Sequence, residues 1–153
     1  MRNLILTLLA AVLVQPLFSI GVSTALSLKD SGTDDFVLEI SNDTPEAIAL
    51  QTYNARPVVE VEVWRANLGI RCRPKDQYDV VQWGGELPQD LAEIPPGTSG
   101  RWEYKVSELS SEVLERPEWR GRFNFDPPWS MAARVSVKCG GRWAEFATPL
   151  IRR

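Results

Sequence analysis

The sequence contains no histidine, and only two cysteines occur among its 153 residues. Without histidine there can be no Ser-His-Asp or Cys-His catalytic arrangement and no metal site built on imidazole. The sequence also lacks a nucleotide-binding GxxxxGK[ST] loop and any cysteine spacing typical of a metal site. We therefore expect a protein that is not an enzyme and that holds neither a metal ion nor an organic cofactor.

Long runs of basic residues are also absent, and the formal net charge is only −3. A nucleic-acid partner is therefore not expected, since proteins of that class carry clustered positive charge. Hydrophobic residues make up 44% of the chain and charged residues 24%, which is an ordinary balance for a globular protein. The length suffices for one domain with its own core. We place this domain at residues 36–153, after a small, polar linker at residues 26–35.

The first residues have the composition of a secretory signal. Arg2 precedes an apolar run over residues 4–20, and the small residues Ser23 and Ala25 follow it. This order predicts a signal peptide over residues 1–25 that is cleaved on export to the periplasm or the extracellular space. The alternative is an uncleaved anchor that would be the protein's one contact with a membrane, although the run is near the short limit for a span.

The two cysteines gain meaning from the predicted export. Exported proteins fold under oxidising conditions, so a disulfide between Cys72 and Cys139 is expected. Closing a loop of this length would stabilise the fold by roughly 4 kcal/mol in the chain-entropy model. The alternative is a reactive thiol at Cys72, because the neighbouring Arg71 and Arg73 would favour its thiolate.

Short β-patterned segments separated by turn residues dominate the rest of the chain. Such segments occupy residues 36–41, 47–53, 58–65, 78–83, 101–106, 122–125, 132–139 and 142–148. Residues 107–116 carry the helical signal, with Ser107 as a cap and an i,i+4 pair between Glu112 and Arg116. The Pro- and Gly-rich residues 84–100 predict a loop. This arrangement resembles the broad immunoglobulin-like class of antiparallel β-sandwiches; a small β-barrel is the alternative.

The closing hairpin allows a closer prediction. A two-residue turn at Gly140-Gly141 places Lys138 opposite Trp143, on the face of the hairpin that carries its polar side chains. Cys139 then lies on the other face, with the residues expected in the core: Val135, Val137, Ala144 and Phe146. A three-residue turn would shift the register by one residue and turn Trp143 inward.

The segment 58–65 repeats this asymmetry, because Trp64 shares a face with Glu60 and Glu62, opposite three valines. In an immunoglobulin-like topology this segment lies in the same sheet as the closing hairpin. The sequence then predicts an aromatic and charged outer surface formed by Trp64, Trp143, Lys138, Arg134, Glu60 and Glu62. The alternative is that these tryptophans are half-buried or that the loop 84–100 covers them.

This surface indicates an exported, non-enzymatic domain that binds a protein partner. A carbohydrate-binding module with a glycan ligand is the second hypothesis, since sugar rings stack on exposed aromatic side chains. Inhibition of exported proteases through the loop 84–100 is a third hypothesis. A hydrolase with two carboxylates is a fourth, but nothing in the sequence selects a pair from the 20 acidic residues.

Overall fold

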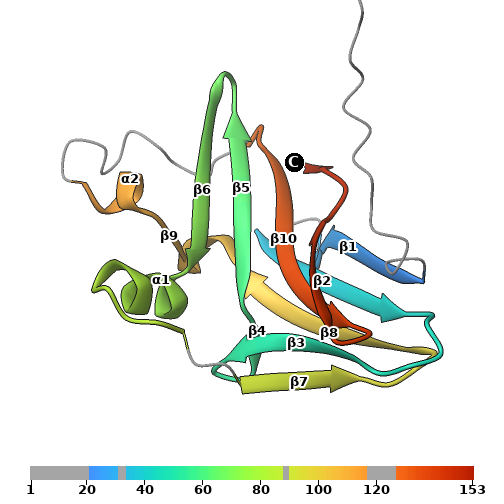
Figure 1. The fold of residues 1–153 in the computed structure, drawn as a ribbon. Helices are drawn as coiled ribbons and strands as arrows, with labels where there is room; N and C mark the ends of the chain where they lie inside the picture. The colour runs from blue at the N-terminus through green and yellow to red at the C-terminus, as the bar shows by residue number, and fades with distance from the viewer. Residues whose placement is uncertain (1–20, 31–33, 88–89, 117–126) are drawn as a thin grey trace, which may run out of the picture.

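The computed structural model describes residues 21–30, 34–87, 90–116 and 127–153 (Figure 1). The strand expected at residues 122–125 lies outside these ranges, as does most of the expected signal peptide. Within the described ranges, no helix has both the length and the apolar character needed to cross a bilayer.

The smaller of the two sheets contains three antiparallel strands in the order β1-β2-β8. These strands are β1 (Val22–Leu28), β2 (Asp35–Asn42) and β8 (Thr98–Lys105). The linker expected at residues 26–35 is therefore wrong in its first part, because Leu26 is buried and pairs with Leu38 of β2. Serine, threonine and alanine separate the buried Val22 and Leu26, and these residues give the segment a polar composition that conceals the strand.

The larger sheet is built around the ten-residue strand β10 (Ser130–Cys139). Its other strands are β3 (Ile48–Tyr53), β4 (Arg56–Pro57), β5 (Val59–Arg65), β6 (Leu68–Pro74), β7 (Asp90–Ile94), β9 (Leu109–Ser110), β11 (Arg142–Ala147) and β12 (Ile151–Arg152). One edge of β10 pairs first with β5 and then with β3, and the other edge pairs with β12 and β11. Strand β7 extends the sheet beyond β3.

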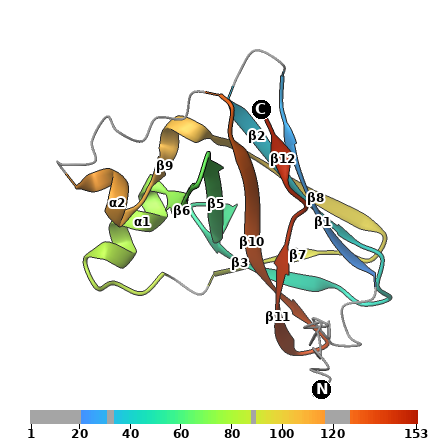
Figure 2. The ribbon, with the colours of Figure 1, turned by 90° about the horizontal axis from the view of Figure 1, so that it is seen from above.

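The core lies between the two sheets, and Figure 2 shows β1, β2 and β8 running together on one side of β10. The alternating pattern of each strand turns one set of side chains toward the opposite sheet. Buried members of this core are Phe36, Leu38, Ile40, Tyr104, Ile48, Leu50, Val59, Val61, Val63, Met131, Ala133, Val135 and Val137. The protein thus has a sandwich-like β fold. Because neither sheet closes on itself, the alternative of a small β-barrel is wrong.

The closing hairpin has the predicted register. Gly140 and Gly141 form its turn, with φ angles of 55° and 78° that favour glycine. Lys138 pairs with Trp143, as a two-residue turn requires. The strand expected at 58–65 corresponds to β5, which pairs directly with β10 and so shares a sheet with the hairpin.

The expected disulfide is not formed, because the two cysteines lie at different ends of the large sheet. Cys72 of β6 pairs with Val61 of β5, which pairs in turn with Ala133 of β10. Cys139 is six positions further along β10, a separation of about 20 Å at ~3.3 Å per residue. A disulfide needs Cα atoms within about 7 Å of each other.

The alternative of a reactive Cys72 thiol also finds no support in the structure. The Cys72 side chain is buried in the core, and this burial raises the pKa of its thiol to about 12. A hydrogen bond with Ser111 lowers that pKa by a smaller amount. The nearby arginines of β6 point away from the core, so they do not stabilise a thiolate.

The expected strand at residues 78–83 is wrong, because these residues fall in helix α1 (Lys75–Gln82) and the turn after it. Local signals for the helix exist: Lys75 and Asp79 form an i,i+4 ion pair, and Asp76 places a negative charge in the first turn. The run Tyr-Asp-Val-Val contains β-favouring residues, and that composition obscured the helical spacing.

The helix expected at residues 107–116 is shorter than predicted. A 3-10 turn spans Val106–Glu108 and strand β9 follows it, so α2 covers only Glu112–Glu115. Ser111, not Ser107, is the N-cap, and its hydroxyl accepts a hydrogen bond from the backbone N–H of Leu114. The predicted ion pair between Glu112 and Arg116 is formed.

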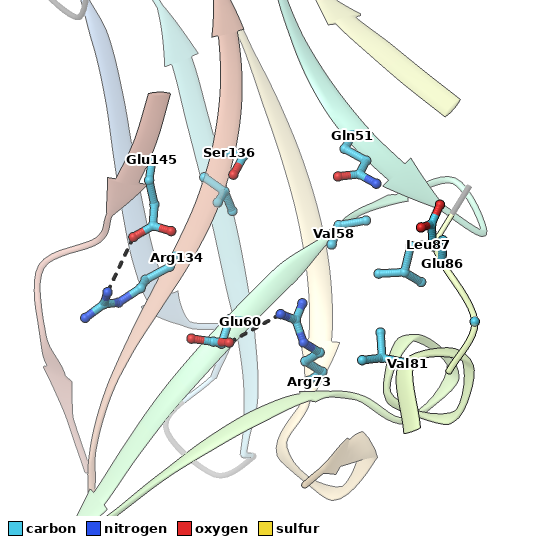
Figure 3. A pocket seen from close by; sticks show the side chains of 12 residues that line it. Gln51, Val58, Glu60, Arg73, Val81, Glu86, Leu87, Arg134, Ser136 and Glu145 are labelled. Atoms are coloured by element: carbon cyan, nitrogen blue, oxygen red, sulfur yellow. Dashed lines mark hydrogen bonds and ion pairs between the residues drawn. The ribbon is translucent and has the colours of Figure 1, made fainter. Parts of the chain in front are cut away.

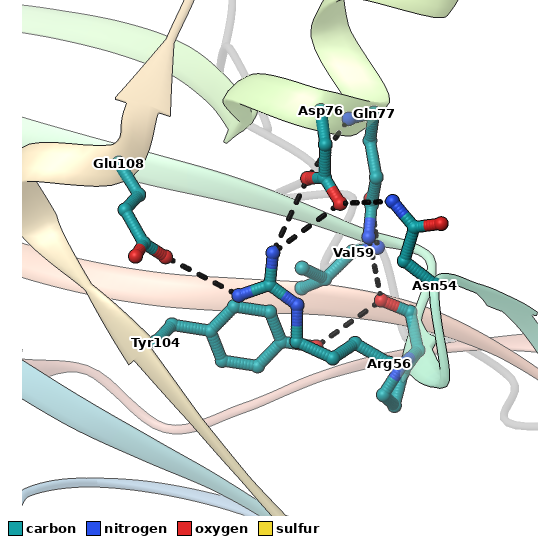
Figure 4. A network of polar contacts seen from close by, with 8 residues as sticks. Asn54, Arg56, Val59, Asp76, Gln77, Tyr104 and Glu108 are labelled. Atoms are coloured by element: carbon teal, nitrogen blue, oxygen red, sulfur yellow. Dashed lines mark hydrogen bonds and ion pairs between the residues drawn. The ribbon is translucent and has the colours of Figure 1, made fainter.

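Helix α1 is attached to the large sheet by one buried polar side chain (Figure 4). Gln77 is fully buried; its Nε2 donates to the Pro57 carbonyl at 2.9 Å, and its Oε1 accepts from the Val59 N–H at 3.1 Å. The Tyr104 hydroxyl donates to the same Pro57 carbonyl at 3.1 Å. Next to this contact, the Arg56 guanidinium lies over the Tyr104 ring, 5.3 Å from its centroid. The contacts fix α1 against the junction between β4 and β5.

Candidate functional site: a groove on the outer face of the large sheet

The outer face of the large sheet carries both predicted tryptophans. Trp64 pairs with Ser130 on β10, and Trp143 pairs with Lys138 on the same strand. Because Ser130 and Lys138 are an even number of positions apart, their side chains share one face of the sheet. Eight positions correspond to about 26 Å along β10. The two tryptophans therefore share a face but form no aromatic pair.

Between the tryptophans lies a row of ion pairs. Arg134 of β10 is 3.1 Å from a carboxylate oxygen of Glu62 and 3.4 Å from one of Glu145. Arg73 lies 3.3 Å from Glu60 in the same row. Pairs this accessible contribute about 0–1 kcal/mol each to stability. Their main effect here is to neutralise most of the charge on this part of the face.

A hollow of about 510 Å³ opens where β10 changes its neighbour from β5 to β3 (Figure 3). Pairing with β5 ends at Val135, and pairing with β3 begins at Val137. The diverging strands β3 and β5 leave the hollow between them. Its lining consists of Gln51, Val58, Glu60, Arg73, Val81, Gly85, Glu86, Leu87, Arg134, Val135, Ser136 and Glu145. We call this region the charged hollow.

A second hollow of about 250 Å³ adjoins the first. It is lined by Gln51, Leu91, Ser136 and Trp143, and we call it the apolar hollow. Leu91 and Trp143 are each 49% exposed, which is high for large apolar side chains. Gln51 and Ser136 line both hollows, so the two form one continuous groove. We call it the β3–β10 groove.

The strand register explains the shape of this groove. Leu91 of β7 pairs with Gln51 of β3, while Trp143 of β11 pairs with Lys138 of β10. The two large apolar side chains therefore rise from the outer strands. Ala49 and Ser136 occupy the inner strands β3 and β10 and have shorter side chains. A trough that follows these two inner strands is the result.

The structure brings three of the six predicted surface residues to this groove: Trp143, Arg134 and Glu60. Trp143 is exposed and forms a wall, so the prediction that it faces outward is confirmed. Arg134 lines the charged hollow and holds Glu62, and Lys138 lies opposite Trp143. Trp64 lies outside the groove, in a separate hollow of about 230 Å³ with Glu62, Gly69, Ile70 and Arg71.

Leu91 was missed by sequence reasoning, and so was its strand. Residues 90–94 form β7 alongside β3, although the Pro- and Gly-rich range 84–100 predicted a loop without strands. The strand therefore widens the face instead of covering it. A weak signal was present, since Leu91 and Glu93 alternate with the buried Ile94. Five residues bounded by prolines are too few for a periodic pattern to stand out.

The groove offers no centre for metal chemistry. Over the part of the chain that the structure describes, no group of three or more acidic or cysteine side chains is placed to hold a metal ion. Glu60 and Glu145 in the groove are instead engaged with arginines. What the arrangement offers is a binding surface: two apolar walls present hydrophobic area, and the polar floor and the ion pairs present hydrogen-bonding groups.

Comparison with known proteins finds a similar solved structure but no matching family. No protein-family model and no curated protein sequence matches the chain. The X-ray structure of Northeast Structural Genomics Consortium target SoR45 is similar at a TM-score of 0.49, with 14% sequence identity. The aligned region covers 88% of this chain and 87% of that one. A likeness of this size carries no argument about function.

Proposed function

We propose that this chain is an exported, non-enzymatic binding domain that holds a protein partner in the β3–β10 groove. The observation that carries the proposal is the pair of half-exposed apolar side chains, Leu91 and Trp143, on either side of a polar trough. Tryptophan is enriched among the residues that dominate binding energy at protein interfaces. Arg134, Glu62 and Lys138 lie beside it and offer polar contacts. Such contacts can fix the position and orientation of the bound partner on this face.

The contribution of Trp143 can be approximated from its exposure. A tryptophan side chain buries up to about 250 Å² when it is fully covered. Since 49% of Trp143 is exposed, a partner could cover roughly 100 Å² more of its surface. At ~25 cal/mol per Å² this amounts to about 2.5 kcal/mol, or about 70-fold in the dissociation constant.

Affinity capture from a native envelope extract tests the proposal. Trp143→Ala and Leu91→Ala should each reduce recovery of the partner strongly while the protein remains folded. Trp83→Ala is the matched control, because Trp83 is 84% exposed at the end of α1 and lines neither hollow. Equal recovery with Trp143→Ala and Trp83→Ala would show that the groove does not bind the partner.

A glycan ligand is the second candidate, and one observation favours it. The exposed Trp143 ring lies beside the amide of Gln51 and the hydroxyl of Ser136, groups that can bond to sugar hydroxyls. Adding soluble polysaccharides should then shift the tryptophan fluorescence of the wild type and not that of Trp143→Ala. A partner found only among proteins, with no such shift, would exclude the glycan hypothesis.

Export is part of the proposal, and strand β1 suggests where the leader ends. A cut after Ala25 would remove four residues of β1, including the buried Val22. For a cut after Gly21, Ser19 and Gly21 are the small residues at the third and first positions before it. Strand β1 begins directly after Gly21. We therefore propose cleavage between Gly21 and Val22.

We also propose that the strand arrangement is immunoglobulin-like. Support comes from β5, the central valine-rich strand, which lies in the same sheet as the closing hairpin of β10 and β11. An experimental structure that placed β5 and this hairpin in different sheets would contradict the assignment.

A further inference from the structure

We propose that the β3–β10 groove binds an extended polypeptide segment that presents a bulky apolar side chain and a basic side chain on the same side. This inference rests on the proposed function and names the chemistry of the partner. Three features of the groove support it: the direction of the groove, the walls of the apolar hollow and the charge balance of the charged hollow.

The direction of the groove favours an extended chain. Its floor follows β3 and β10. From the level of Trp143, which pairs with Lys138, to Arg134 it covers four positions of β10. Four positions correspond to about 13 Å, which is the length of about four residues in extended conformation. Alternate side chains of such a segment point to the same side at intervals of about 6.6 Å. Two of them could thus enter the groove, one in each hollow.

The apolar hollow selects the first of these side chains. Leu91 and Trp143 are on strands separated by β3 and β10, so about 14 Å of sheet lies between their backbones. An apolar side chain seated between them would cover both exposed surfaces. Gln51 and Ser136 beneath it carry an amide and a hydroxyl, groups that can bond to the backbone of the bound segment.

The charged hollow selects the second side chain by its charge. Its lining includes two guanidinium groups and three carboxylates. Arg73 pairs with Glu60, and Arg134 pairs with Glu145. Glu86 is exposed and forms no ion pair with any described residue. The charged hollow therefore carries one negative charge that no arginine of its lining balances. A lysine or arginine of the partner would balance it, whereas an acidic side chain would be repelled.

Selection from a random library of nine-residue displayed peptides tests this inference on the full, folded protein. The wild type should enrich peptides that carry Leu, Ile, Phe, Trp or Met together with Lys or Arg two or four positions away. Glu86→Lys should abolish the basic preference, and a synthetic peptide from the wild-type selection should bind this variant at least about threefold more weakly. Glu46→Lys is the matched control, since Glu46 is exposed and lines neither hollow.

Each other outcome has a separate meaning. The inference would be overturned if the selected peptides were not enriched in Lys or Arg, or if Glu86→Lys left that enrichment unchanged. If no peptide is enriched while Trp143→Ala still abolishes capture from the envelope extract, the groove binds a partner but not an extended segment. If no peptide is enriched and capture does not depend on Trp143, both this inference and the proposed function are wrong.

Discussion

Replacing Gln77 by leucine would test how helix α1 is held against the large sheet. Gln77 is the one residue of α1 that is fully buried, and it bonds to the backbone of β4 and β5 through both ends of its amide. Leucine has a similar volume but no polar atom. The substitution would therefore leave the packing nearly filled and remove only the two hydrogen bonds.

The cost of this change follows from the partners that remain. The Val59 N–H would lose its acceptor inside the core, which costs about 1–3 kcal/mol. The Pro57 carbonyl would keep the hydrogen bond from the Tyr104 hydroxyl, so its loss is smaller. We expect a total destabilisation of about 2–3 kcal/mol, a large share of the roughly 5–15 kcal/mol typical of a domain.

Urea unfolding followed by tryptophan fluorescence measures this difference. Gln82→Leu is the matched control: Gln82 ends the same helix and is exposed, and among the described residues its side chain bonds only to Asp79 at the surface. The control should change the free energy of unfolding by less than about 0.5 kcal/mol. If Gln77→Leu costs no more than Gln82→Leu, the attachment of α1 does not depend on the buried amide.

A glutamate at the same position adds a test with a defined pH dependence. A protonated carboxyl can accept from the Val59 N–H and donate to the Pro57 carbonyl, as the Gln77 amide does. Burial raises the pKa of such a carboxyl above its unfolded value of about 4.3. Gln77→Glu should therefore be near wild-type stability below pH ~4 and lose stability as the pH rises through the raised folded pKa. A variant whose stability relative to wild type is independent of pH would contradict this.

Three further predictions concern other parts of the molecule. Burial raises the pKa of the Cys72 thiol to about 12, above its unfolded value of about 8.5. Between these pH values the free energy of unfolding should fall by up to about 1.4 kcal/mol per pH unit, and Cys72→Ala should remove that slope. A methyl group at Gly69 would lie 2.6 Å from the Trp64 ring, so Gly69→Ala should shift the fluorescence emission of Trp64. In a Trp64→Phe background the same substitution should cause no shift. Mass spectrometry of the exported protein should find Val22 as its first residue; a mature chain that begins elsewhere would contradict the assigned cut after Gly21.

The parts of the fold that the sequence predicted correctly depend on neighbours along the chain. The hairpin register follows from Gly140-Gly141 and the alternation on either side, so Trp143 could be assigned to the outer face without a structure. The alternation in β5 likewise predicted which of its side chains face the core. Both patterns are set by interactions among residues close in sequence.

The errors arose where distant segments compete with local preference. Residues 78–83 form part of a helix because Gln77 can bury its amide against β4 and β5, which no local pattern reveals. The range 90–94 becomes a strand because β3 offers it an edge to pair with. The cysteines stay apart because β5 separates β6 from β10 and Cys139 lies far along that strand.

The sequence by itself thus determined which face of the closing hairpin is exposed, and it identified Trp143, Lys138, Arg134 and Glu62 as residues of one surface. Only the tertiary structure decided that this surface contains a groove. The groove exists because β10 changes its partner from β5 to β3 and because β7 brings Leu91 to the side opposite Trp143. Pairing between strands far apart in sequence depends on the packing of the whole core, and therefore it cannot be read from local periodicity.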